Sequence, residues 1–390
     1  MQALIFIFSL IILHLPFVSS YQVAVFGGNG FIGSRVCKVL SNIPGCSVIS
    51  ISRSGVPPSW CRDEVWANKV KWVAADAACI NINDEDDVKK MIGTSHINAA
   101  VSCVGNVRPS PTWDGFWGLH WDDQVMRNEN GDVNVNIAKL CKSLKCQKFV
   151  YVSVSYDTAK ALEGPLAGYL DGKRDAEEAA YQVFANDAIV FGPSLVYGGG
   201  RFASLGRILE TILDSPIAKL YQSSNNALRG LSSSYEEDWV TNMAMTPPTH
   251  VDVISRAIAA AAVGSLDVQT IQPRRQGFFN TEGKPIDMVP VPFVDVGDLK
   301  MVAEQCGNDE SLSVPISSSA TAYNNQGEEE EGRQVLSGTP WKNEERDNLP
   351  LEGALVGYKP LLYPFPVAAF FITLFQWATN IEYPISNPVE

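Results

Sequence analysis

Val23-Ala24-Val25-Phe26-Gly27-Gly28-Asn29-Gly30-Phe31-Ile32-Gly33 is the stretch that decides the fold. It is an apolar run that breaks into glycines and then resumes at 34–40 with a helical pattern. The pattern predicts a strand, a tight turn and a helix, because glycine serves where φ is positive and where backbone approaches a pyrophosphate. The free N–H groups of the new helix attract the same anion. We therefore expect a dinucleotide to contact Gly27, Gly28, Asn29, Gly30, Phe31, Ile32 and Gly33, the alternative being a purely structural turn.

The end of the next expected strand, within 47–55, bears on which dinucleotide binds. A carboxylate there would hold both ribose hydroxyls of NAD, whereas an arginine between small hydroxyl residues can neutralise a 2′-phosphate. Ser52, Arg53 and Ser54 supply the second arrangement, and no acid stands among them. We therefore expect NADP, with NAD as the alternative. On the competing interpretation, Arg53 is a solvated loop charge.

Further strands and helices are expected to alternate along the chain. The strands are expected at 71–76, 97–105 and 148–155, a further strand with its following loop at 188–198, and helices at 84–92 and 130–144. This alternation predicts an α/β fold, a doubly wound parallel Rossmann sheet with a smaller C-terminal substrate-domain region and an irregular tail. Asp76 ends one strand where an adenine amine can be accepted, and Gly105 with Asn106 is expected near the nicotinamide. The aromatic segment 109–123 is interpreted as a substrate lid or as a loop packed on the sheet.

Tyr169 and Lys173 are the candidate acid/base pair, one helical turn apart on the same face. An ammonium at this spacing can lower the pKa of the phenol and hold the ribose, while the phenol exchanges a proton with a carbonyl or alcohol. Ser153 or Ser155, at the end of the preceding strand, would hydrogen-bond the same oxygen. The alternative is an ordinary surface helix face.

Several of these segments together resemble the atypical and extended short-chain dehydrogenase/reductases. The matching segments are 27–33, 52–55, 149–153, 168–177 and 193–198, in that order. Within this group the chain is most similar to coenzyme Q biosynthesis accessory reductase-like proteins and their chloroplast relatives, and more distantly to the nucleotide-binding accessory subunit of respiratory complex I. The resemblance covers about 21–264.

The resemblance implies an oxidoreductase that transfers hydride to or from a carbonyl or alcohol of a small apolar substrate, such as a quinone or isoprenoid. The first alternative is a catalytically idle nucleotide-binding subunit of a membrane complex, and the second is a nucleotide-sugar epimerase or dehydratase. Relatives usually carry arginine where Phe191-Gly192 stands, and Arg201 is expected to compensate. His250 is expected either near the ligand or as the cap of the following helix.

The two ends of the chain predict targeting and membrane contact. Residues 1–20 are typical of a secretory signal peptide, which implies the ER lumen, secretion or a complex plastid, with the mitochondrion an alternative from the resemblance. Residues 21–265 are the expected nucleotide-binding domain and 266–310 its extension. Residues 311–345 are expected to be a disordered acidic linker, and the apolar tail at 346–390 to dock on a membrane surface or pack on the body.

The composition argues against a nucleic-acid partner and against a metal site. A formal net charge of −13 disfavours nucleic acid. The eight cysteines are scattered as small apolar residues would be, without the spacing of a disulfide framework. With four histidines and no Cys-x-x-Cys pair, the sequence predicts no metal site.

Overall fold

The computed structural model describes residues 20–80, 92–94, 96–107, 122–156, 158–159, 166–202, 206, 209, 246–266, 271, 291–299 and 301–302. These ranges omit the acidic linker, the apolar tail and all of the predicted signal peptide except its last residue. They also omit most of the predicted helix at 84–92 and most of the aromatic segment at 109–123.

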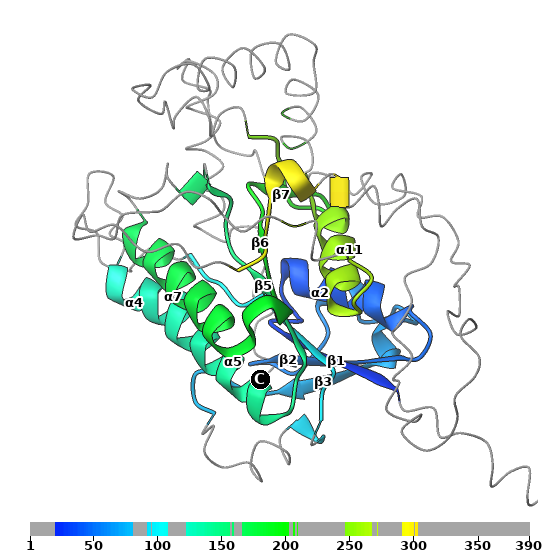
Figure 1. Cartoon of the computed structure of the whole chain (residues 1–390). Helices are drawn as coiled ribbons and strands as arrows, with labels where there is room; N and C mark the ends of the chain where they lie inside the picture. The colour runs from blue at the N-terminus through cyan, green and yellow to red at the C-terminus, as the bar shows by residue number, and fades with distance from the viewer. Residues whose placement is uncertain are drawn as a thin grey trace, which may run out of the picture.

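A parallel sheet forms the centre of the molecule (Figure 1). Its order is β3 (Val70–Ala74), β2 (Cys46–Ser52), β1 (Tyr21–Phe26), β4 (Ala99–Ser102), β5 (Lys148–Val152), β6 (Ala188–Gly192) and β9 (Phe293–Asp295). All neighbouring strands pair in parallel. The chain runs outward from β1 to β3 and then returns to β4 on the other side of β1. The strand order reverses between β1 and β4, and the carboxyl ends of two such strands are the position where doubly wound sheets bind dinucleotides.

Alternate residues of β1 face two hydrophobic cores, as expected of a strand buried on both sides. Val23 and Val25 pack with α2 (Phe31–Ser41) and α11 (Val251–Ala262). Ala24 and Phe26 pack with α5 (Val133–Ser143) and α7 (Ala167–Phe184). Figure 1 shows these two pairs of helices on opposite sides of the sheet. The predicted doubly wound α/β fold is therefore confirmed.

Short elements complete the described part. Three 3₁₀ turns are η1 (Ser59–Cys61), η2 (Ala67–Lys69) and η4 (Ala185–Asp187). β7 (Val196–Tyr197) and β8 (Thr249–His250) form a separate parallel pair next to α11. Within the described ranges, no helix is both long and apolar enough to cross a membrane. The seven cysteines in those ranges are free thiols, so no disulfide crosslinks this part.

The helix predicted at 130–144 begins earlier than expected. It starts as α4 (Asp123–Arg127), passes through one π-helical turn, η3 (Asn128–Asp132), and continues as α5. β9 was also not expected, because it has only three residues and directly follows a proline. It extends the sheet beside β6, so a segment from the expected C-terminal extension belongs to the central sheet.

Glycines bring α7 into backbone contact with the α4–η3 segment. A Cβ built on Gly168 would lie 2.0 Å from the carbonyl oxygen of Asp123, and one on Gly172 would lie 2.7 Å from that of Arg127. A Cβ on Gly131 would lie 2.9 Å from the Cα of Gly172. These clearances leave no room for larger side chains, so the glycines set how deeply α7 sits against its neighbour and thereby where Lys173 lies.

Candidate functional site

The glycine turn has the geometry that the sequence predicts for an anion site. Gly27 adopts φ +73°, and a Cβ on Gly33 would lie 2.2 Å from the carbonyl oxygen of Gly27. Gly30 is the N-cap of α2 and has no side chain to fill the helix end. A Cβ built on Gly30 would lie 3.0 Å from the carbonyl oxygen of Gly27. The first intrahelical bond of α2 runs from the N–H of Ser34 to the carbonyl oxygen of Gly30, so the N–H groups before Ser34 have no acceptor within the helix, and the cradle fits a pyrophosphate.

The loop after β2 folds against this turn. The amide of Asn29 donates to Ser54 Oγ over 2.7 Å, and Ser52 Oγ accepts from the backbone N–H of Gly55 over 3.2 Å. Arg53 is exposed beside them. At the end of β3, Asp76 is exposed and its carboxylate accepts from the backbone N–H of Ala78 over 3.1 Å. The predicted roles of Arg53 and Asp76 toward a nucleotide stay predictions.

Lys173 lies buried at the carboxyl ends of β4 and β5. Its Nζ donates to the carbonyl oxygen of Val152 over 2.9 Å and lies 3.5 Å from that of Val104. A Cβ on Gly105 would lie 2.9 Å from the same Nζ, so the backbone of Gly105 lies close to the ammonium. Burial lowers the pKa of Lys173 to about 8, an effect that Glu177 and Cys103 partly oppose. The structure thus brings together Gly105, which was expected near the nicotinamide, and Lys173, which was expected to hold the ribose.

Tyr169 lies one turn before Lys173, with the ammonium 5.6 Å from the centre of its ring. The ring packs in a small apolar cluster with Val107, Met126, Val154, Ala159, Leu166 and Leu170. Burial raises the pKa of the Tyr169 hydroxyl above its usual value of 10. This is opposite to the expected lowering by Lys173, because desolvation of the phenolate outweighs an ammonium whose hydrogen bond is directed at a backbone carbonyl.

Both candidate serines are buried and donate their hydroxyl protons elsewhere. Ser153 Oγ donates to the carboxylate of Glu177 on α7. Ser155 Oγ donates to Thr158 Oγ1 over 2.6 Å. A serine hydroxyl has one proton to donate, so either residue would have to release its partner before donating to a substrate oxygen. The assignment of a serine to the site stays a prediction.

Two buried asparagines that the sequence analysis missed fix the loop after β4. The side chain of Asn130 accepts from the backbone N–H of Asn106 over 2.9 Å and donates to its carbonyl oxygen over 2.8 Å. Asn134, one turn later, accepts from Ser102 Oγ over 2.5 Å and donates to the carbonyl oxygen of Val104 over 3.2 Å. Asparagines four residues apart within an apolar helical pattern are the signal that could have found them.

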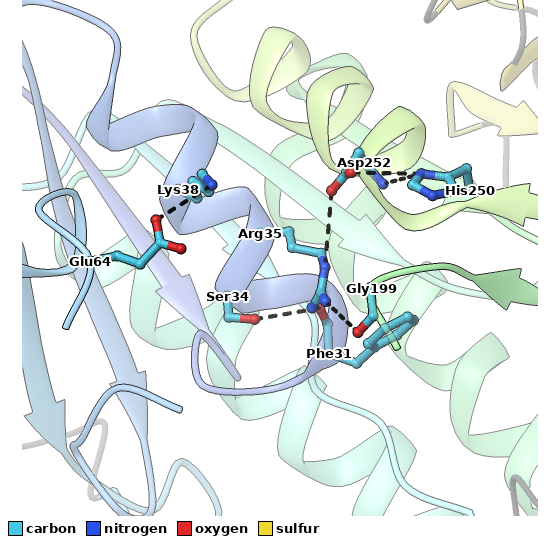
Figure 2. Close-up of polar contacts among 8 residues, drawn as sticks. All are labelled: Phe31, Ser34, Arg35, Lys38, Glu64, Gly199, His250 and Asp252. Carbon is cyan, nitrogen blue, oxygen red and sulfur yellow. Dashed lines mark hydrogen bonds and ion pairs between the residues drawn. The ribbon is translucent and has the colours of Figure 1, made fainter. Parts of the chain in front are cut away.

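Arg35 joins the glycine-turn helix to two distant segments (Figure 2). Its guanidinium donates to the carbonyl oxygens of Phe31, over 2.9 Å, and Gly199, over 3.1 Å. Its Nε lies 4.0 Å from a carboxylate oxygen of Asp252 on α11. The guanidinium carbon of Arg35 lies 4.6 Å from the centre of the Trp60 ring. Only 3% of Arg35 is exposed. Sequence reasoning had no means of pairing these segments, since a single arginine in a helix carries no signal of its partners.

Two further predictions concern the region around β7 and β8. His250 is the N-cap of α11, and its Nδ1 accepts from the backbone N–H of Asp252 over 3.3 Å, so the capping interpretation is confirmed. Arg201 places its guanidinium 5.1 Å from the centre of the Phe31 ring, at the first residue of α2. Arg201 is therefore near the glycine turn, although its expected compensating role is not tested by this contact.

Residues 23–200 match the family described as the NAD dependent epimerase/dehydratase family. The matched residues include most of β1 and all of β2 to β6 of the parallel sheet. An uncharacterized chloroplastic protein of Arabidopsis thaliana is 29% identical over 246 residues, which cover 63% of this chain and 72% of the relative. MIOREX complex component 2 of Saccharomyces cerevisiae is 44% identical over 57 residues, which are 14% of this chain and only 20% of the relative.

Solved structures are similar at lower sequence identity. A UDP-glucuronic acid 4-epimerase from Bacillus cereus, in complex with NAD, is 16% identical with a TM-score of 0.39, covering 62% of this chain and 72% of its own. A UDP-Glc/GlcNAc 4-epimerase from Campylobacter jejuni is also 16% identical, with a TM-score of 0.41 and coverages of 63% and 75%. The expected closer resemblance to coenzyme Q accessory reductases and the complex I subunit stays a prediction.

Proposed function

We propose that this chain is a member of the epimerase/dehydratase family that binds NADP(H) over the glycine turn and acts as a reductase on an apolar carbonyl compound of the quinone or isoprenoid class. The observation that carries the proposal is the position of Lys173 Nζ, buried at the carboxyl ends of β4 and β5 and in contact range of Gly105. A dinucleotide whose pyrophosphate rests on the start of α2 extends across this edge, so the ammonium is within reach of its ribose.

NADP is proposed over NAD because of the loop after β2. No carboxylate stands at Ser52, Arg53 or Ser54 to pair with two ribose hydroxyls. Instead, Ser54 is tied to Asn29 of the glycine turn, and the exposed Arg53 stands between two hydroxyl residues. A guanidinium and hydroxyls together suit a phosphate.

The proposed chemistry assigns the proton to the chain's own residues. When bound, the reduced nicotinamide would supply a hydride to the carbonyl carbon. Tyr169 would donate its proton to the carbonyl oxygen, which becomes a hydroxyl, and would regain a proton from solvent. The raised pKa of Tyr169 suits this direction, because the phenol is fully protonated at neutral pH. The ammonium of Lys173 would stabilise the transient phenolate.

Tyr169→Phe tests the reductase directly, because it removes the transferable proton and little else. NADPH consumption with short-chain quinones as acceptors is expected to fall by about 10²- to 10⁴-fold, while the dissociation constant of NADPH stays within about twofold. Tyr181→Phe, on the same helix, is the matched control and is expected to behave as wild type. A wild-type protein that binds NADPH but consumes none with any quinone would contradict the reductase part of the proposal.

A catalytically idle nucleotide-binding subunit is the second candidate. It is favoured by the engaged hydroxyl protons of Ser153 and Ser155, and by the partial likeness to a protein named as a complex component. This candidate predicts that Tyr169→Phe restores a null strain fully while Gly30→Val does not. An epimerase or dehydratase is the third candidate, named in the family description, and Arg53 weighs against it because such an enzyme is expected to use NAD.

The location is proposed from the ends of the chain. A cleaved leader at 1–20 and a peripheral membrane contact by the tail at 346–390 would bring the protein to an apolar substrate. The chloroplastic relative supports a plastid among the compartments that the leader allows. N-terminal sequencing of native protein that begins at Met1, or full recovery of the intact chain in the soluble fraction, would contradict the corresponding part.

A further inference from the structure

A buried carboxylate, that of Glu177, lies one helical turn beyond Lys173 on α7 and has no place in the mechanism above. Only 7% of Glu177 is exposed, and its carboxylate accepts a hydrogen bond from Ser153 Oγ at the end of β5. Burying a carboxylate so deeply is costly unless a positive charge compensates it. The spacing of four residues along α7 places the Lys173 ammonium on the same helix face.

Lys173 is also a buried charged group, of the opposite sign. Only 4% of Lys173 is exposed, and its ammonium donates to the carbonyl oxygen of Val152, the residue immediately before Ser153. Both groups are therefore hydrogen-bonded at the end of β5, Lys173 to the backbone carbonyl of Val152 and Glu177 to the hydroxyl of Ser153. The Tyr151 ring lies 5.0 Å from the ammonium and excludes water from this side.

We propose that Glu177 is a positioning residue whose carboxylate, fixed by Ser153, keeps Lys173 protonated at the carboxyl edge of the sheet. Its importance for nucleotide affinity rests on the proposed function, in which the charged ammonium contacts the ribose. The opposing influences on the pKa of Lys173 agree with this role: burial lowers it, and Glu177 is the larger of the two groups that raise it.

The other groups that face Lys173 do not substitute for Glu177. Cys103, in the loop after β4, also raises the pKa of Lys173, but burial raises the pKa of the thiol itself to about 12, so it is neutral at physiological pH. Tyr151 on β5 and Tyr169 on α7 present neutral rings. Of the other acids of α7, Asp175 is paired with Arg127 of α4, Asp171 is paired with Arg174, and Glu178 is exposed.

The test is the protonation midpoint of Lys173 in the full chain without nucleotide. Nitrogen-15 NMR of the lysine side chains follows it, with the resonance assigned by its loss in Lys173→Met. Glu177→Gln keeps the shape and is expected to lower the midpoint from about 8 by about one pH unit or more, the usual effect of losing a close opposite charge. Glu178→Gln is the matched control, since Glu178 is the exposed neighbour and its partner is Gln182.

Equal midpoints in Glu177→Gln and Glu178→Gln would overturn the proposal. If Glu177→Gln does not fold, as judged by circular dichroism, Ser153→Ala takes its place. That variant removes only the hydrogen bond that fixes the carboxylate and is expected to lower the midpoint by a smaller amount, and an unchanged midpoint would count against the proposal. Because the readout needs no nucleotide, a protein that shows the shift but binds no NADPH would contradict the proposed function alone.

Discussion

Arg35 donates a hydrogen bond to the carbonyl oxygen of Gly199, 164 residues further along the chain. A Cβ on Gly199, which has φ +57°, would lie 1.9 Å from the Arg35 Nη2, so a glycine here makes room for the guanidinium. The same side chain approaches Asp252 of α11 (Figure 2). The helix that begins at the glycine turn is thus fixed to the turn after β7 and to the last long helix of the described part.

Arg35→Met is expected to destabilise the fold by about 2–4 kcal/mol, because it leaves two partly buried carbonyls and a mostly buried carboxylate without their cation. Urea denaturation measures the change. Lys38→Met is the control on the same helix, since its pair with Glu64 is more exposed and is expected to contribute less than about 1 kcal/mol. Equal effects of the two substitutions would contradict the role assigned to Arg35.

Gly168→Ala is expected to destabilise the protein by about 1–3 kcal/mol, because the new methyl group would overlap the backbone of Asp123 and push α4 from α7. Thermal unfolding measures the effect. A Cβ on Gly297 has no atom within 4 Å, so Gly297→Ala is the matched control and is expected to change stability by less than about 0.5 kcal/mol. A tolerated Gly168→Ala would mean that the helices can separate without cost.

The pH dependence of stability should carry a contribution from Lys173. Its pKa is about 8 in the folded chain against its ordinary value of 10.5, so between these limits the unfolded chain binds more protons. The contribution of Lys173 to unfolding free energy therefore rises from about pH 8 to about pH 10.5 and is constant outside this window. Urea denaturation of wild type and Lys173→Met at several pH values isolates it, because other groups titrate alike in both. A difference independent of pH would contradict the lowered pKa.

Arg53→Ala is expected to weaken NADPH binding at least about tenfold and to leave NADH binding within about twofold, because only NADPH carries the 2′-phosphate. Calorimetric titration with both nucleotides measures this. Arg62→Ala removes an exposed arginine from a nearby loop and serves as the control. Equal weakening of both nucleotides by Arg53→Ala would remove the NADP assignment.

The sequence predicted the parts of the fold that local pattern determines. The glycine turn, the alternation of strands and helices, the turn-spaced pair Tyr169 and Lys173, and the cap at His250 all follow from short-range chemistry. β9 was not predicted, because a three-residue segment after a proline forms a strand only by pairing with the edge of β6.

The candidate site was less predictable than the fold, because burial determines its electrostatics. Spacing alone placed Lys173 beside Tyr169 but could not show that both are buried, and burial reverses the expected direction of the phenol's pKa. The partners of Ser153 and Asn130 depend on how closely α7 and η3 approach the sheet, which glycine packing decides.

Isothermal titration of wild type and Gly30→Val with NADPH tests the central claim most directly. The valine side chain would stand at the start of α2, where the pyrophosphate is proposed to lie, with its Cβ 3.0 Å from the carbonyl oxygen of Gly27. The account predicts that wild type binds NADPH and that Gly30→Val, folded by circular dichroism, shows no measurable binding. Equal NADPH affinity in the two proteins, or a folded wild type that binds neither NADPH nor NADH, would contradict it.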